Sequence, residues 1–216
     1  MGSGDRIEVK ICGLTRLEDA RFAAGALADY LGFIFYEKSP RFISPAKAGA
    51  IVNWLEGSET VGVFVNQPLD DVNMIARQTG IGMVQLHGKE SPEYCQMVDL
   101  PVIKAFHIHD TMTQQELLDE VEPYLNHVDR LLFDTGGRKV WGGTGETFNW
   151  EVVSNLSLPV PFFLSGGLNP GNIRQAYEQV QPDAVDLNSG LEMSPGLKDF
   201  DKLEALFEQM EVIRDR

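Results

Sequence analysis

Short apolar segments rich in β-branched and aromatic residues recur along the chain, and longer segments with helical periodicity separate them. Most of the short segments are continuously apolar rather than alternating, as expected for parallel strands that helices cover. None approaches the roughly 18 consecutive apolar residues of a membrane span. The pattern predicts eight strands: Ile7–Ile11, Tyr30–Phe35, Thr60–Val65, Met83–Leu86, Val102–Phe106, Arg130–Asp134, Pro161–Leu164 and Ala184–Leu187.

The segments between these strands are predicted to be helices. Two of them begin with a cap residue followed by proline at the first helical position, at Ser44-Pro45 and Ser91-Pro92. The predicted helices are Leu17–Ala26, Pro45–Leu55, Leu69–Gln78, Ser91–Met97, Gln114–Tyr124, Trp150–Asn155, Gly171–Gln179 and Phe200–Arg214.

Strict alternation of strands and helices implies parallel pairing, because parallel neighbours need a crossover of about a dozen residues. Eight units in 216 residues leave 216/8 = 27 residues for each, which suits a (βα)8 barrel. An open doubly wound sheet is the rival, but Ile11–Thr15 lacks the glycine fingerprint of dinucleotide-binding sheets. We therefore predict an α/β fold, a single (βα)8 TIM-barrel domain over residues 1–216, with residues 1–5 a disordered N-terminus or a cloning remnant.

The net charge and the cysteine content indicate which binding partners and which cellular compartment to expect. The chain has 18 Lys and Arg against 32 Asp and Glu, a formal net charge of −14. A phosphate backbone or an anionic membrane would repel such a chain, so we expect no nucleic acid and no membrane partner. Cys12 and Cys95 allow one disulfide at most, and we see no signal peptide. These features predict a cytoplasmic protein.

Two glycine-rich segments follow the last two predicted strands, where barrels frequently bind a substrate phosphate. One contains Gly166 and Gly167, and the other contains Asn188, Ser189 and Gly190. Glycine lets backbone N–H groups approach an oxyanion closely, and a helix N-terminus adds a favourable partial charge. A Gly-Gly pair alone also suits an ordinary tight turn. Two such segments at neighbouring strand ends favour a phosphate site.

Cys12 follows the first predicted strand, and Asp134 ends the sixth. Cys12 could be an inert buried thiol, and Asp134 could simply cap the following loop. At the C-terminal mouth of a barrel, however, the two would face one pocket as a base and an acid. Asp186 ends the eighth strand in the same way. This arrangement favours proton transfer on a sugar phosphate.

Other polar residues are predicted to surround the same pocket. Arg41 could hold a substrate carboxylate or be an ordinary solvated charge, and His87 could face the ligand. The glycine-rich segment Trp141–Thr147 suits a mobile lid. His107 and His109 lack a third ligand in any zinc-like spacing, so no metal site is expected.

Motifs at the predicted strand ends together identify a family. They lie at Val9–Thr15, Gly32–Phe35, Lys38–Arg41, Val61–Asn66, Val84–Gly88, Phe133–Thr135, Gly142–Gly145, Leu164–Leu168 and Asp186–Glu192. In this order the motifs resemble those of the phosphoribosylanthranilate isomerase family, (βα)8-barrel enzymes of tryptophan biosynthesis. Each motif is weak alone, but the set is highly specific and the resemblance runs nearly end to end.

The resemblance implies an Amadori rearrangement of N-(5-phosphoribosyl)anthranilate by general acid–base catalysis. It implies Asp134 as the general acid that opens the furanose ring and Cys12 as the general base that removes the C2 proton. It implies that Arg41 holds the anthranilate carboxylate and that the loops of Gly166–Gly167 and Asn188–Gly190 hold the phosphate. It implies no cofactor and no metal.

Two residues qualify the resemblance. Asn188 stands where family members more often carry serine, which leaves the detail of the phosphate contacts open. Asp186 matches a family aspartate and is expected to support the site and contact substrate, as His87 is, rather than to transfer the proton.

Two rival functions use the same barrel. The sister isomerase of histidine biosynthesis performs the same rearrangement on a substrate with two phosphates, but that family has an aspartate where Cys12 stands. A non-catalytic phosphate-binding barrel is the second rival, but it would not need both Cys12 and Asp134. We therefore expect a small-molecule substrate as the partner, and a monomer or a homodimer as the assembly.

Overall fold

The computed structural model describes residues 6–109, 111–135 and 150–214. In this part of the chain eight parallel strands close into a barrel in sequence order, with β1 pairing to β8. They are β1 (Glu8–Ile11), β2 (Tyr30–Ile34), β3 (Glu59–Phe64), β4 (Met83–Leu86), β5 (Val102–His107), β6 (Arg130–Asp134), β7 (Phe162–Ser165) and β8 (Ala184–Leu187). The predicted TIM barrel is confirmed, and each predicted strand end lies within one residue of the observed one.

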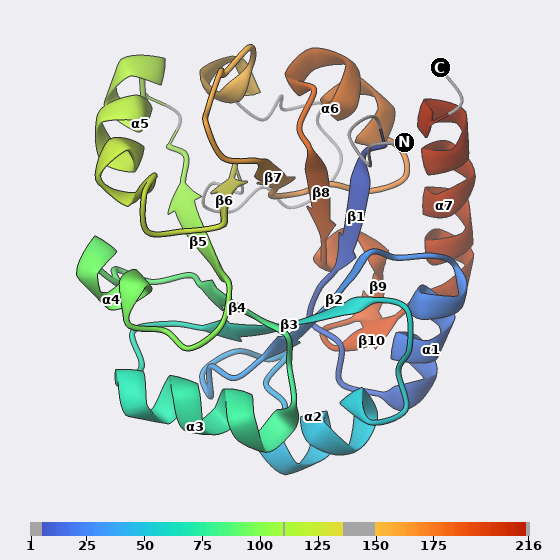
Figure 1. The fold of residues 1–216 in the computed structure, drawn as a ribbon. Coiled ribbons are helices and arrows are strands. Elements are labelled where there is room, and N and C mark those ends of the chain that lie inside the picture. The colour runs from blue at the N-terminus through green and yellow to red at the C-terminus, as the bar shows by residue number, and fades with distance from the viewer. Residues whose placement is uncertain (1–5, 110, 136–149, 215–216) are drawn as a thin grey trace.

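The helices form an outer layer around the strands (Figure 1). The two predicted start signals are confirmed, because the side chains of Ser44 and Ser91 accept the backbone N–H groups of Lys47 and Tyr94. No helix in the described residues is long and apolar enough to cross a membrane. The α-helices are α1 (Leu17–Gly25), α2 (Pro45–Val52), α3 (Leu69–Thr79), α4 (Pro92–Gln96), α5 (Gln114–Val121), α6 (Ile173–Val180) and α7 (Phe200–Arg214).

The helix predicted at Trp150–Asn155 is wrong. The structure has a single 3-10 turn there, η2 (Trp150–Val153). The Ser154 hydroxyl donates to the Trp150 carbonyl at 2.7 Å, and Asn155 has a left-handed φ of 55°, which ends the turn. Serine, asparagine and β-branched valine all disfavour continuation of a helix.

An unpredicted hairpin follows β8. A 3-10 turn, η3 (Ser189–Leu191), leads into two short antiparallel strands, β9 (Glu192–Ser194) and β10 (Leu197–Lys198). Gly196 in the connecting turn has a φ of 80°, which favours glycine. The hairpin returns Glu192 and Lys198 to the barrel mouth, where both are buried.

Side chains fill the barrel, so it is a packed core and not a pore. The larger apolar cluster lies between the strands and the helices. The smaller cluster draws on seven strands and consists of Tyr30, Val61, Met83, Ile103, Ala105, Leu132, Phe163 and Ala184. Groups that meet a ligand must therefore lie at the strand ends and in the loops that follow them.

Candidate active site

A cavity of about 550 Å³ opens at the C-terminal ends of the barrel strands. This volume is within the usual range for sites that bind small molecules. β1 and β6, which position Cys12 and Asp134, are three strand steps apart through β8 and β7. The predicted site residues that line the cavity are Cys12, His87, Asp134, Gly166, Gly167, Asp186, Asn188 and Ser189. The predicted base and acid therefore share one cavity.

Cys12 lies directly after β1 and is buried. Gly32 of β2 makes room for it, because a Cβ at position 32 would come within 2.8 Å of the Cys12 sulfur. Burial raises the pKa of Cys12, and attraction to Lys10 only partly offsets this effect. Burial therefore disfavours the thiolate form of Cys12.

Lys10 and Asp186 form a buried ion pair beneath Cys12. The Lys10 ammonium lies 2.9 Å from Asp186 Oδ1, and both side chains are almost fully buried. Burial lowers the pKa of Lys10, but attraction to Asp186 and Cys12 outweighs it, so the pKa is raised overall. The Ser165 hydroxyl donates to Asp186 Oδ2 at 3.5 Å. Asp186 therefore compensates the buried Lys10 charge.

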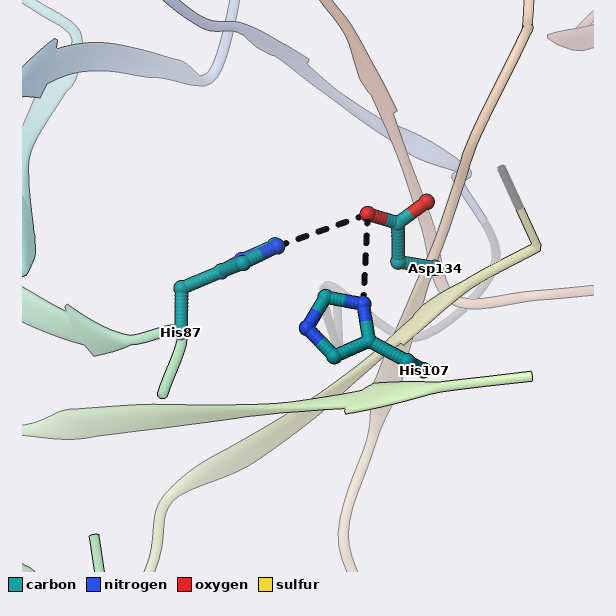
Figure 2. Close-up of side chains that lie close together, drawn as sticks. All are labelled: His87, His107 and Asp134. Carbon is teal, nitrogen blue, oxygen red and sulfur yellow. Dashed lines mark ion pairs between the residues drawn. The ribbon is translucent and has the colours of Figure 1, made fainter. Parts of the chain in front are cut away.

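Asp134 ends β6 beside two imidazoles (Figure 2). Its Oδ2 lies 3.4 Å from His87 Nε2 and 3.8 Å from His107 Nδ1. The Gln85 amide nitrogen donates to His87 Nδ1 at 2.9 Å, so neutral His87 carries its proton on Nε2, which faces Asp134. Burial and the neighbouring His87 lower the pKa of His107, although Asp134 opposes them. Asp134 thus has two histidine neighbours, one directly after β4 and one at the end of β5.

The two glycine-rich segments pack against each other at the ends of β7 and β8. Gly166 and Gly167 have φ angles of 99° and 64°, a region that favours glycine. A Cβ at Gly190 would collide with the Leu168 carbonyl oxygen, so only glycine permits this close approach. Ser189 begins η3, and the first backbone N–H groups of such a turn have no acceptor within it. The two segments therefore lie side by side at the edge of the cavity.

Arg41 is not among the residues that line the cavity, and it is paired with Glu192. Its Nε donates to Glu192 Oε1 at 2.8 Å and its Nη2 to Oε2 at 2.6 Å. Burial raises the pKa of Glu192, but Arg41 and the nearby Lys198 outweigh it, so the pKa is lowered. Lys198 also donates to the Asn188 carbonyl at 3.0 Å. Gly13 lets Arg41 and Asn188 approach, since a Cβ there would lie 2.8 Å from Arg41 Cδ.

Four residues contact the predicted site residues without having been predicted from the sequence: Gln85, Ser165, Glu192 and Lys198. A signal existed for Gln85, which is a polar residue inside the apolar strand β4. Glu192 and Lys198 reach the site through the hairpin, and nothing in their spacing predicted that contact. The segment predicted to be a lid, Trp141–Thr147, lies outside the described residues.

Comparisons with known proteins agree with this geometry. The family model for N-(5'phosphoribosyl)anthranilate (PRA) isomerase matches residues 9–209. The N-(5'-phosphoribosyl)anthranilate isomerase of Geobacter metallireducens is 46% identical over 198 residues, which cover 91% of this chain and 95% of the relative. The isomerase of Geobacter sulfurreducens is 45% identical, with 89% and 93% covered.

Solved structures of the same enzyme superpose on the barrel. The crystal structure of phosphoribosyl anthranilate isomerase from Thermotoga maritima has a TM-score of 0.83 and 37% identity, and covers 95% of this chain and 99% of its own. A second structure, in complex with reduced 1-(o-carboxyphenylamino)-1-deoxyribulose 5-phosphate, has a TM-score of 0.81 and 36% identity over the same shares. The chain therefore belongs to the N-(5'-phosphoribosyl)anthranilate isomerase family.

Proposed function

We propose that the protein converts N-(5-phosphoribosyl)anthranilate to 1-(2-carboxyphenylamino)-1-deoxyribulose 5-phosphate in tryptophan biosynthesis, with Asp134 as the general acid and Cys12 as the general base. One observation carries the assignment. In a chain of this isomerase family, Cys12 and Asp134 line one cavity at the C-terminal mouth of the barrel. Aldose-to-ketose rearrangement needs only proton transfers, so no cofactor is required.

Asp134 acts in the first half of the reaction. Its carboxyl group donates a proton to the furanose ring oxygen, and the C1–O bond breaks as its electron pair moves to that oxygen. The anthranilate nitrogen lone pair then forms a C1=N iminium. The proton must come from a positioned acid because the ring oxygen is a poor leaving group without it. His87, held by Gln85, contacts Asp134 and keeps the carboxyl group oriented.

Cys12 acts in the second half of the reaction. The thiolate removes the C2 proton, the C–H electron pair forms a C1=C2 bond, and the iminium electrons return to nitrogen. The resulting enolamine loses its hydroxyl proton and gains one at C1, which gives the ketone. The positive iminium favours the thiolate, because a nearby cation lowers a thiol pKa. Because burial raises the pKa of Cys12, its proton needs an acceptor, and the Asp134 carboxylate that ring opening leaves behind takes it.

Two anionic ends of the substrate orient it. The main-chain N–H groups of Gly166, Gly167 and the segment Asn188–Gly190 hold the phosphate at the ends of β7 and β8. Arg41 holds the anthranilate carboxylate, while its Nε and Nη2 remain on Glu192. Among the described residues no hydrogen bond engages Arg41 Nη1, so this group is the donor for the substrate. Backbone groups and one arginine thereby bind a substrate with two anionic groups despite the chain's acidic excess.

The same proposal extends to location and assembly. A substrate with a phosphate and a carboxylate does not cross a bilayer unaided, which favours the cytoplasm as the place of action. A structure from Thermotoga maritima is described as monomers generated from a dimeric enzyme. Sedimentation of this protein will distinguish a monomer from a homodimer.

The test is turnover of N-(5-phosphoribosyl)anthranilate by the wild-type protein. The fluorescence of the anthranilate group should fall with time, and mass spectrometry should find a product of unchanged mass. Carbon-13 NMR of that product should show a ketone at C2 and a methylene at C1. Substrate that remains unchanged, or that yields only anthranilate, would contradict the proposed function.

A further inference from the structure

Three side chains at the ends of adjacent strands converge on one point of the cavity. His87 follows β4, His107 ends β5 and Asp134 ends β6. Figure 2 shows both imidazoles directed at the Asp134 carboxylate. One ligand atom from each residue lies within 4.8 Å of the other two. The proposed reaction uses Asp134 and His87 but gives no task to His107.

The separations fit a metal ion. Bonds of about 2.0–2.1 Å in tetrahedral geometry place neighbouring ligand atoms about 3.3 Å apart. Asp134 Oδ2 lies 3.4 Å from His87 Nε2 and 3.8 Å from His107 Nδ1. The two imidazole nitrogens lie within 4.8 Å of each other, so a movement of His107 towards both His87 and Asp134 completes the geometry. His107 has a side chain 56% exposed and can make this shift.

The donor set selects the kind of ion. Two imidazole nitrogens and one carboxylate oxygen suit Zn²⁺ and its first-row neighbours, whereas Mg²⁺ and Ca²⁺ prefer oxygen ligands only. Three protein ligands leave one coordination position for water. The side chains of His87 and Asp134 are 24% and 22% exposed, so an ion can enter from the cavity.

Gln85 provides a supporting contact for a metal-bound His87. The Gln85 amide oxygen is buried and has no hydrogen-bond partner among the described residues. A metal on His87 Nε2 requires the proton to move to Nδ1, where it needs an acceptor. Rotation of the Gln85 amide presents its oxygen to that Nδ1–H, replacing the present bond from the amide nitrogen. The same residue can thus hold either tautomer of His87.

We propose that His87, His107 and Asp134 form a binding site for a divalent transition-metal ion such as Zn²⁺, which inhibits the enzyme. Asp134 as a ligand cannot carry the proton that ring opening needs, and the ion lies in the cavity that the substrate enters. The inhibition rests on the proposed isomerase function, but the metal binding does not. The spacing of His107 and His109 shows no third ligand, whereas His87, His107 and Asp134 come together from the ends of three strands.

The binding test is a titration of metal-free protein with Co²⁺, followed by visible absorption. The wild type should bind one equivalent and develop the d–d bands of a four- or five-coordinate ion. His107→Asn should weaken binding at least about tenfold, since loss even of a supporting contact costs 10–100-fold. His109→Asn is the matched control and should bind as the wild type does. Absence of binding, equal binding by His107→Asn, or an intense thiolate-to-cobalt band from Cys12 would each overturn the proposal.

The inhibition test uses Zn²⁺ in the fluorescence assay. Zn²⁺ should raise KM for N-(5-phosphoribosyl)anthranilate without lowering kcat in the wild type and in His109→Asn. His107→Asn should retain basal turnover and require at least about tenfold more Zn²⁺ for the same effect. Turnover with no sensitivity to Zn²⁺ would overturn the inhibition. Cobalt binding with the predicted variant pattern but no turnover would instead refute the isomerase function and leave the metal site standing.

Discussion

The two ends of the barrel use aspartate in opposite ways. At the N-terminal end, an aspartate precedes β2, β6 and β8, and each accepts a backbone N–H from the preceding strand. The bonds run from Val9 N to Asp29 Oδ2, from Val102 N to Asp129 Oδ2 and from Phe162 N to Asp183 Oδ2, at 2.8, 2.8 and 2.9 Å. At the C-terminal end, Asp134 faces two imidazoles and the cavity.

This difference shows that what an aspartate does depends on the end of the barrel at which it lies. A carboxylate before a strand is engaged by main-chain donors and holds the loop to the barrel, whereas one after a strand meets the ligand. Asp29 illustrates the first case most fully, because it also pairs with Arg6 at 2.6 Å and Arg214 at 3.1 Å. Substitutions at the C-terminal end should therefore lower activity, and substitutions at the N-terminal end should lower stability.

The largest expected effect is that of Asp134→Asn on turnover. The amide cannot donate the proton that ring opening needs, so kcat should fall at least ~10²-fold, a typical acid–base contribution. The side chain keeps its size, so the free energy of unfolding should change by less than ~1 kcal/mol. Fluorescence kinetics and urea unfolding measure the two quantities. Wild-type kcat in this variant would remove Asp134 from the mechanism.

Cys12→Ser should lower kcat by at least ~10² as well, because a hydroxyl is a far weaker acid than a thiol and does not form the base at neutral pH. Serine is smaller than cysteine, so the buried position beside Gly32 accepts it. Cys95→Ser, at a buried position in α4, is the matched control and should keep kcat within about threefold of the wild type. Equal losses in both variants would indicate a structural role for Cys12.

Arg41→Lys should affect binding more than chemistry. Lysine cannot hold Glu192 with two parallel bonds and also reach the substrate carboxylate. Loss of one hydrogen bond to a charged group costs about 1.5–3 kcal/mol, so KM should rise about tenfold or more. A change in kcat of less than about threefold is expected with it. If kcat falls and KM is unchanged, Arg41 does not bind the carboxylate.

Asp29→Ala tests the opposite end of the barrel. The substitution leaves the Val9 N–H and the Arg6 and Arg214 side chains without this acceptor. The free energy of unfolding should fall by ~1–3 kcal/mol, the cost of an unsatisfied donor. The folded variant should keep kcat within about threefold of the wild type. A loss of turnover as large as in Asp134→Asn would contradict the claim that Asp29 serves stability and Asp134 serves activity.

The smallest effect concerns the pH dependence of thiol alkylation. Burial raises the pKa of Cys12, and burial likewise raises the pKa of Cys95 to about 11. Only thiolates react, so both thiols should react slowly at pH 7, with rates rising about tenfold per pH unit up to pH 9. Peptide mapping after iodoacetamide treatment measures each site. Product should protect Cys12 and leave Cys95 unchanged, and a plateau for Cys12 below pH 8 would show a lowered pKa.

The strands could be predicted because continuous apolar runs are a local property of the sequence. The turn at Trp150–Val153 could not, since helix periodicity over six residues does not outweigh the preferences of Val152, Ser154 and Asn155 for other backbone states. Cys12 and Asp134 were predictable because strand ends define the mouth of a barrel. The contacts Arg41–Glu192 and His87–His107–Asp134 join residues far apart in sequence, so spacing alone could not show them.

The proposal that Asp134 is the general acid and Cys12 the general base is tested most directly by a kinetic isotope effect. Substrate deuterated at C2 is compared with unlabelled substrate in the wild type and in both variants. Cys12→Ser should show a clear primary isotope effect on kcat, because removal of the C2 proton limits its rate. Asp134→Asn should show a value near one, because ring opening limits its rate. A primary effect in Asp134→Asn together with none in Cys12→Ser would contradict the assigned roles.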